Sequence, residues 1–311
     1  MTTIVDELAY DAVVVGGGPA GLSAALILGR ACRRVLLCDA GNGRNAPAAE
    51  AHGILTRDGT PPAELRRIGR EQLRPYAIDV RDLDVVDIDH AGNGFTVALG
   101  DGTKVRARKI LLATGLVDEL PPIAGIEALW GNGVFNCPYC HGWEVRNQPL
   151  AVYGRGEAGL HLVTLLRGWS DDVVLCTDGA FGLNEEERGR LGALGVGLRE
   201  EEIVRLDGTG GALEGIVFAD GSALSRRGLL LHAPVRQRTD LPARLGCAFT
   251  DQGRIAVDEV GATSVPGVAA AGDAANLMPQ VMLAAASGVL AGAGLNRAML
   301  VEDAAVLADR V

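Results

Sequence analysis

The hydrophobic pattern of the first forty residues alternates between short apolar runs and one long amphipathic stretch. Residues 11–41 read DAVVVGGGPAGLSAALILGRACRRVLLCDAG, which predicts a strand, a glycine turn, a helix and a second strand. Gly16, Gly18 and Gly21 have the spacing that permits a tight turn, the approach of a pyrophosphate and close helix packing. Asp39 ends the second strand, where its carboxylate can accept hydrogen bonds from a ribose. The pattern therefore predicts a nucleotide-binding unit.

The same pattern returns in the second half of the chain. Residues 148–179 read QPLAVYGRGEAGLHLVTLLRGWSDDVVLCTDG, and Gly154, Gly156 and Gly159 lie 138 residues after the glycines of the first turn. The apolar run that follows them ends near an acid, Asp178. A second nucleotide-type unit is therefore expected, and these four residues are its candidate contacts with a nicotinamide nucleotide.

Shorter repeats complete both units and define the fold class. In each half, β-like stretches with glycine-rich turns precede an apolar closing strand. A last strand at 268–273 ends in Gly272 and Asp273, and a helical run starts at about Gln280. The carboxylate of Asp273 suits a ribose or polyol hydroxyl, with a helix N-cap as the structural alternative. We expect an α/β fold of two Rossmann-like domains, the second inserted into the first, each with a small antiparallel β insertion.

Composition narrows the classes of function. The chain has 311 residues, 48% of them hydrophobic and 22% charged, which is typical of a globular protein of about two domains. Its net charge of −10 and the lack of a basic cluster disfavour nucleic-acid binding. No secretory pattern is seen at the N-terminus, and residues 281–300 fit a buried helix better than a membrane span. We therefore expect a cytoplasmic protein without a membrane partner.

A Cys-x-x-Cys pair stands just before the second unit, in the stretch FNCPYCHGWE at 135–144. The spacing of Cys137 and Cys140 permits a short disulfide loop, and such motifs lower the pKa of one thiol. His141 follows directly and could act as a base to a thiol or as an acid to a leaving thiolate. The alternatives are a zinc site, which would need two further ligands, covalent haem attachment, and an inert pair. The position between two nucleotide-type units favours redox chemistry without a metal.

The order of these motifs resembles the low-molecular-weight thioredoxin reductase family over nearly the whole chain. The residues that carry the resemblance are GGGPAG at 16–21, ILLATG at 110–115, CPYC at 137–140, GRGEAG at 154–159 and AAGDA at 270–274.

The resemblance implies a homodimer with a discontinuous FAD-binding domain at 1–117 and 245–311. The domain between them, at 118–244, is of the pyridine-nucleotide type and carries the redox pair. It also implies that Cys140 faces the flavin and that Cys137 exchanges with substrate. The positions that match the FAD-lining residues of the family are Gly16, Gly18, Pro19, Ala20, Gly21, Asp39, Asn45, Thr114, Gly115, Gly272, Asp273 and Gln280.

Two departures from the family pattern bear on function. An acid usually follows the second cysteine, but here the residue is His141. The basic cluster that grips the 2′-phosphate of NADPH is missing from 176–181, where Asp178 would repel a phosphate and suit a 2′-hydroxyl. The use of NADPH is therefore in doubt, while NADH, or no pyridine nucleotide, fits the sequence. Both departures resemble the branch of dithiol oxidases that close disulfides in natural products such as gliotoxin and holomycin.

The leading hypothesis is oxidation of a small dithiol through Cys137, Cys140 and FAD, with O2 as the acceptor. The alternative is an NAD(P)H-dependent reductase of a thioredoxin-like protein. A redox-sensing flavoprotein without turnover is a third class. The stretch at 41–59 is expected to form a long loop over the flavin, in which His52 either faces the substrate or is solvated.

Overall fold

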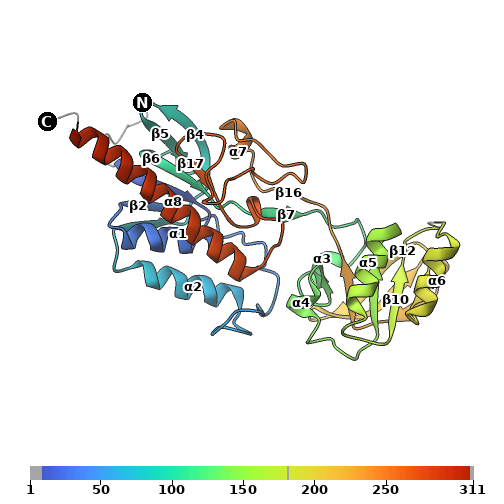
Figure 1. The fold of residues 1–311 in the computed structure, drawn as a ribbon. Coiled ribbons are helices and arrows are strands. Elements are labelled where there is room, and N and C mark those ends of the chain that lie inside the picture. Colours follow the sequence, from blue (N-terminus) through green and yellow to red (C-terminus); the bar gives the residue numbers. More distant parts are fainter. Residues whose placement is uncertain (1–8, 181, 309–311) are drawn as a thin grey trace. The chain divides into compact units, whose positions relative to one another are not determined.

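The computed structural model describes residues 9–180 and 182–308, which form two compact units (Figure 1). Unit 1 comprises Met1–Arg44, Ala63–Val117 and Arg236–Val311, and unit 2 comprises Asn45–Pro62 and Asp118–Val235. The units divide at 117/118, where the expected domains also divide. The second division lies at 235/236 rather than 244/245, and the expected loop at 41–59 clusters mostly with unit 2.

Unit 1 is built on a seven-stranded sheet with the order β3-β2-β1-β6-β5-β4, and β17 pairs with β6. The strands β3, β2, β1, β6 and β17 run parallel, and Val13 of β1 pairs with Leu36 on one side and Ile110 on the other. The strands β4 and β5 add an antiparallel extension to β6, which confirms the expected insertion. The bounds are β1 Ala9–Val15, β2 Val35–Cys38, β3 Ile78–Arg81, β4 Val85–Ala91, β5 Gly94–Leu99, β6 Lys104–Leu112 and β17 Val268–Ala270.

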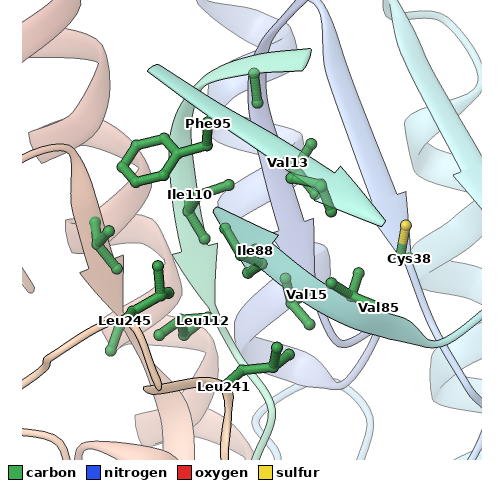
Figure 2. Packing of buried hydrophobic residues seen from close by; sticks show 14 of the residues in the cluster. Val13, Val15, Cys38, Val85, Ile88, Phe95, Ile110, Leu112, Leu241 and Leu245 are labelled. Carbon is green, nitrogen blue, oxygen red and sulfur yellow. The ribbon is translucent and has the colours of Figure 1, made fainter. Parts of the chain in front are cut away.

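Successive residues of the strands in unit 1 pack on opposite faces of the sheet, as the pleat requires. Val13 and Val15 lie in one core cluster with Ile110 and Phe95, while Ala12 belongs to a second cluster with the helices (Figure 2). Both faces are apolar because helices cover one and the antiparallel extension with the 241–265 region covers the other. This explains why the strand sequences read as continuous apolar runs.

The helices α1 and α8 lie side by side on unit 1 (Figure 1). Their close approach depends on glycine, because a Cβ at Gly288 would lie 2.0 Å from the carbonyl oxygen of Ala20, and one at Gly292 would lie 3.0 Å from that of Ala24. A 3-10 turn at Gly272–Ala274 follows β17. The helices of unit 1 are α1 Pro19–Arg30, α2 Pro62–Leu73, α7 Leu241–Arg244 and α8 Val281–Ala308.

Only one face of α8 is buried. The helix predicted to be buried at 281–300 is therefore half-buried. Its buried residues include Gly288, Leu295 and Met299, whereas Leu290 and Leu300 are more than half exposed. By length and composition it is the one helix in the described part of the chain that could cross a membrane, a test that core helices of soluble proteins also pass. Its packing on α1 identifies it as a helix of the core.

Unit 2 contains a five-stranded parallel sheet with the order β11-β10-β9-β15-β8 and a separate three-stranded antiparallel sheet β12-β13-β14. The helix α6 begins at a capping box between Asn184 and Glu187. Where the chain passes between the units, β7 Leu116–Asp118 pairs with β16 Val235–Gln237. The strands of unit 2 are β8 Val134–Phe135, β9 Leu150–Tyr153, β10 Val173–Cys176, β11 Gly197–Arg199, β12 Ile203–Thr209, β13 Ala212–Phe218, β14 Ala223–Ser225 and β15 Gly228–Leu231, and its helices are α3 Ile126–Leu129, α4 Pro138–His141, α5 Gly156–Leu166 and α6 Glu185–Ala193.

Replacement of Gly288 by valine is expected to destabilise unit 1 by about 3 kcal/mol, at the upper end of the range for overpacking. The new Cβ would collide with the backbone of α1. The control Ala293→Val, on the exposed side of the same helix, should cost less than about 1 kcal/mol. Urea unfolding followed by circular dichroism measures both, and equal midpoints for the two variants would contradict this account of the contact.

Candidate active site and nucleotide-binding turns

The first glycine turn has the shape of a dinucleotide cradle. Gly16 adopts a φ of +107°, and a Cβ there would lie 2.3 Å from the carbonyl oxygen of Ala113. A Cβ at Gly21 would lie 1.8 Å from the carbonyl oxygen of Gly16. Gly18, the N-cap of α1, has open space where a side chain would be, and no side chain caps the helix. Pro19 and Ala20 form the first turn of α1, whose free N–H groups suit a phosphate.

Asp39 lies beside this turn at the end of β2 and is 7% exposed. Its carboxylate accepts hydrogen bonds from the backbone N–H of Gly41 at 3.1 Å and from Nη2 of Arg70 at 2.7 Å. Burial raises the pKa of Asp39, but these two bonds and the charge of Arg66 outweigh burial and hold the pKa below its usual value. The group therefore stays ionised, which suits an acceptor of ribose hydroxyl bonds. Gly17 is required here, because a Cβ would lie 2.4 Å from Oδ2 of Asp39.

The other candidate residues of unit 1 lie in two segments at the carboxyl ends of β6 and β17. The hydroxyl of Thr114 is buried and has no hydrogen-bond partner among the described residues, as expected of a group that awaits a ligand. Gly115 has a φ of +69°. Gly272 and Asp273 form the 3-10 turn, and Gln280 directly precedes α8.

Arginine side chains around these acids were missed by the sequence analysis. Nη1 of Arg44 lies 3.1 Å from Oδ2 of Asp273, and Nη1 of Arg66 donates to the carbonyl oxygen of Gly41 at 2.8 Å. The signal was the basic face of α2, which reads ELRRIGR. Asn45, a further candidate, clusters with unit 2 instead. The open cradle, the orphaned hydroxyl and the ionised acid of unit 1 together fit a dinucleotide.

The redox pair lies in unit 2 where β8 gives way to α4. Cys137 is the N-cap of this short helix, and its carbonyl oxygen accepts from the N–H groups of Cys140 at 3.1 Å and His141 at 3.2 Å. The two cysteines form a disulfide with Cα atoms 5.3 Å apart, and both are partly exposed. The pair is thus oxidised and accessible, and its sulfur atoms are joined to each other rather than available as thiolate ligands.

His141 is held against the redox pair with its ring stacked on Phe135 at 5.6 Å between centroids. Both ring nitrogens are buried, and neither makes a well-formed hydrogen bond to any described protein group. Burial lowers the pKa of His141, although the nearby backbone of Gly131 and the charge of Glu144 oppose this shift. The imidazole is therefore neutral at neutral pH and available to accept a proton.

Two aromatic side chains beside the disulfide were also missed. Tyr139 and Trp143 are 67% and 65% exposed. Tyr139 meets the ring of Trp169 edge-on at 5.3 Å, and Arg146 stacks on Trp143 at 3.8 Å. Their spacing around Cys140 was visible in the motif, but nothing in the sequence distinguished exposed aromatic residues from core residues.

The second glycine turn has the expected backbone, and its own side chains form hydrogen bonds around it. A Cβ at Gly154 would lie 2.9 Å from the Cα of Gly159, so this pair packs closely, and Gly156 begins α5 with a φ of +53°. Between them, Arg155 donates to the carbonyl oxygens of Thr177, at 2.7 Å, and Asp178.

The carboxylate of Asp178 is already engaged on both oxygens. Oδ2 accepts from the hydroxyl of Tyr153 at 3.1 Å and lies 3.6 Å from Arg155, while Oδ1 accepts from the N–H of Ile203 at 2.8 Å. Burial and the charge of Asp178 raise the pKa of Tyr153, which keeps its hydroxyl a donor. The residue expected to bind a ribose thus also links the turn to β9 and β12.

His52 is neither solvated nor unpaired. Its side chain is 17% exposed, with Nε2 3.5 Å from carboxylate oxygens of Glu50 and Glu144 and Nδ1 3.5 Å from one of Asp58. Glu144 follows the redox motif, so His52 lies on unit 2 near the disulfide. The solvated-loop hypothesis is wrong for this residue.

Comparisons with known proteins agree with this arrangement. The family model for pyridine nucleotide-disulphide oxidoreductases matches residues 10–288. Thioredoxin reductase tcpT from Claviceps purpurea is 34% identical over 91% of this chain and 92% of its own length. The crystal structure of HlmI superposes with a TM-score of 0.93 at 39% identity, covering 98% of this chain and 96% of HlmI. A putative thioredoxin reductase, TrxB, from Bacillus anthracis gives 0.90 at 32% identity, covering 94% and 99%.

Replacement of Gly18 by alanine is expected to leave the fold intact but to remove the dinucleotide. Alanine fits the backbone, which has a φ of −74°, and meets no atom within 4 Å. The methyl group would occupy the space of a pyrophosphate, so cofactor retention should fall by about tenfold or more, at least 1.4 kcal/mol. Gly189→Ala in α6, another open position, is the control. Retention is measured as flavin absorbance per protein, and normal retention in Gly18→Ala would refute the cradle.

Proposed function

Because this chain belongs to the pyridine nucleotide-disulphide oxidoreductase family, we propose that it is an FAD-dependent oxidase that closes disulfides in a small dithiol. The observation that carries the proposal is the combination of an accessible Cys137–Cys140 disulfide, a neutral buried His141 and a second glycine turn whose Arg155 bonds backbone oxygens. The coarser activity, oxidoreduction of sulfur groups of the thioredoxin reductase type, is common to the relatives.

The chemistry of the redox pair follows from thiol–disulfide exchange. A substrate thiol gives its proton to His141, and the thiolate attacks the sulfur of Cys137, so that Cys140 leaves as a thiolate. The second substrate thiol then attacks the substrate sulfur of the mixed disulfide, so that the cyclic disulfide forms and Cys137 leaves as a thiolate, which takes up the second proton. The substrate loses two electrons and two protons, and the enzyme disulfide gains the two electrons. FAD, when bound in unit 1, supplies the acceptor that reoxidises the pair and passes the electrons to O2.

The second turn supports oxidation over reduction. Residues 176–181, where the family binds the 2′-phosphate of NADPH, contain no arginine or lysine. The nearest cation, Arg155, bonds the backbone oxygens of Thr177 and Asp178. The high similarity to HlmI and the resemblance to the natural-product dithiol oxidases point the same way.

Reduction of a thioredoxin-like protein by NAD(P)H is the second candidate. It is favoured by the names of the relatives and by the intact backbone of the second turn at Gly154, Gly156 and Gly159.

We also propose that the protein is a cytoplasmic homodimer. The unpaired side of α8 supports a second copy of the chain as its partner, because Leu290, Leu300 and Val301 are each more than half exposed along one helix. Exposed apolar side chains that gather on one element are typical of a protein–protein interface.

Anaerobic mixing with single reductants tests the direction of electron flow. We expect dithiothreitol to bleach the flavin and admission of air to restore it, while NADH and NADPH bleach it slowly or not at all. The variants Cys137→Ser and Cys140→Ser should keep the flavin but lose dithiol turnover by more than about 10³-fold. Rapid bleaching by a nicotinamide would establish the reductase, and full turnover in either serine variant would remove both functions.

The pH dependence of dithiol oxidation tests the role of His141. Because burial lowers the pKa of this imidazole, its basic form persists to lower pH than in an ordinary histidine, whose pKa is about 6.5. The acid limb of kcat/KM for dithiothreitol should therefore lie below pH ~6.5. His141→Gln should lose this limb and about 10²-fold in kcat/KM. A wild-type limb above pH ~7 would exclude His141 as the base.

A further inference from the structure

The segment at 45–62 is part of the redox unit although it is far from it in sequence. Asn132 clamps this segment, since its Oδ1 accepts from the N–H of Ala49 at 3.2 Å and its Nδ2 donates to the carbonyl oxygen of Pro47 at 3.0 Å. Gly131 permits the approach, because a Cβ there would lie 2.9 Å from the backbone nitrogen of Ala48. The segment is therefore fixed on the surface from which the Cys-x-x-Cys motif emerges.

This docking presents His52 to a cage of three carboxylates. Asp58 holds the Nδ1 side at 3.5 Å and is itself fixed by the N–H of Gly53 at 2.7 Å. On the other side, Nε2 lies 3.5 Å from both Glu50 and Glu144. Of these acids, only Glu144 comes from the redox motif.

Glu144 lies three residues after His141, in the turns that follow α4. Its negative charge favours the protonated form of His141 and so raises the pKa of His141, whereas the charge of a protonated His52 lowers it. Glu144, His52 and the backbone of Gly131 and Cys137 are thus the groups near His141 that act on its pKa. One carboxylate is shared between two imidazoles.

We propose that Glu144 and His52 are positioning residues for the proton transfer at His141. Glu144 stabilises the imidazolium that forms when a thiol proton reaches His141. The charge of a protonated His52, which lies 3.5 Å from the Glu144 carboxylate, opposes part of this effect, so that His141 can release the proton again. The role of these residues in catalysis rests on the proposed function. Their effect on the pKa of His141 does not, because it can be measured in the oxidised protein without turnover.

Titration of the imidazole signals by NMR tests this without any turnover. The chain has five histidines, so single His→Gln variants assign the His141 signal. In the oxidised protein, Glu144→Gln should move the His141 midpoint to lower pH, and His52→Gln should move it to higher pH. The acid limb of dithiothreitol oxidation should shift in the same two directions.

Glu50→Gln is the matched control, because Glu50 touches the same nitrogen of His52 as Glu144 but belongs to the docked segment rather than to the redox motif. It should leave the His141 midpoint unchanged. Shifts of the same sign in the Glu144 and His52 variants, no shift in either, or an equal shift in Glu50→Gln would overturn the proposal. If the midpoints shift as expected but dithiothreitol is not oxidised, the proposed function fails and the electrostatic coupling stands. Circular dichroism confirms that each variant is folded.

Discussion

The start of α1 is fixed by two contacts between backbones that only glycine allows, and the nucleotide site of unit 1 depends on both. Gly21 packs on the carbonyl oxygen of Gly16, and Gly288 packs on that of Ala20. The first contact shapes the turn, and the second fixes the helix behind it against a segment more than 250 residues away in sequence. The free N–H groups of α1 are therefore positioned before any ligand arrives, so that little conformational entropy is lost on binding. These glycines therefore determine the direction of the N-terminus of α1 relative to the sheet.

In the redox unit the important feature is a polar group, the imidazole of His141, that is buried without a strong hydrogen-bond partner. A buried imidazole without a well-formed hydrogen bond is costly, and His141 is such a group. The cost is consistent with function, because a desolvated neutral imidazole is a ready acceptor for a thiol proton. Aromatic packing on Phe135 keeps the ring in place without satisfying its nitrogens.

Sequence patterns predicted the elements of both units because the glycine turns and apolar strands are local features. The strand–turn–helix order at 11–41 and the last helix after Gln280 appear as expected. The roles that depend on distant contacts could not be predicted in this way. Asp178 matched a ribose acceptor by position, yet its partners Tyr153 and Ile203 come from other strands. His52 lay in a loop without periodicity, and only its docking through Asn132 reveals its neighbours.

The bonds of Arg155 within the second turn have a consequence for how the two units respond to heat. Bonds between a turn's own side chains and backbone are present with or without a ligand, whereas a ligand that binds an open cradle stabilises it with the logarithm of ligand concentration over Kd. The interactions of the second turn therefore contribute to the folding free energy of unit 2 at all times. Unit 1 leaves the space beside Gly18 open and the Thr114 hydroxyl without a partner among the described residues. The stability of unit 1 would then depend on the supply of its dinucleotide, whereas the bonds of the second turn need no ligand.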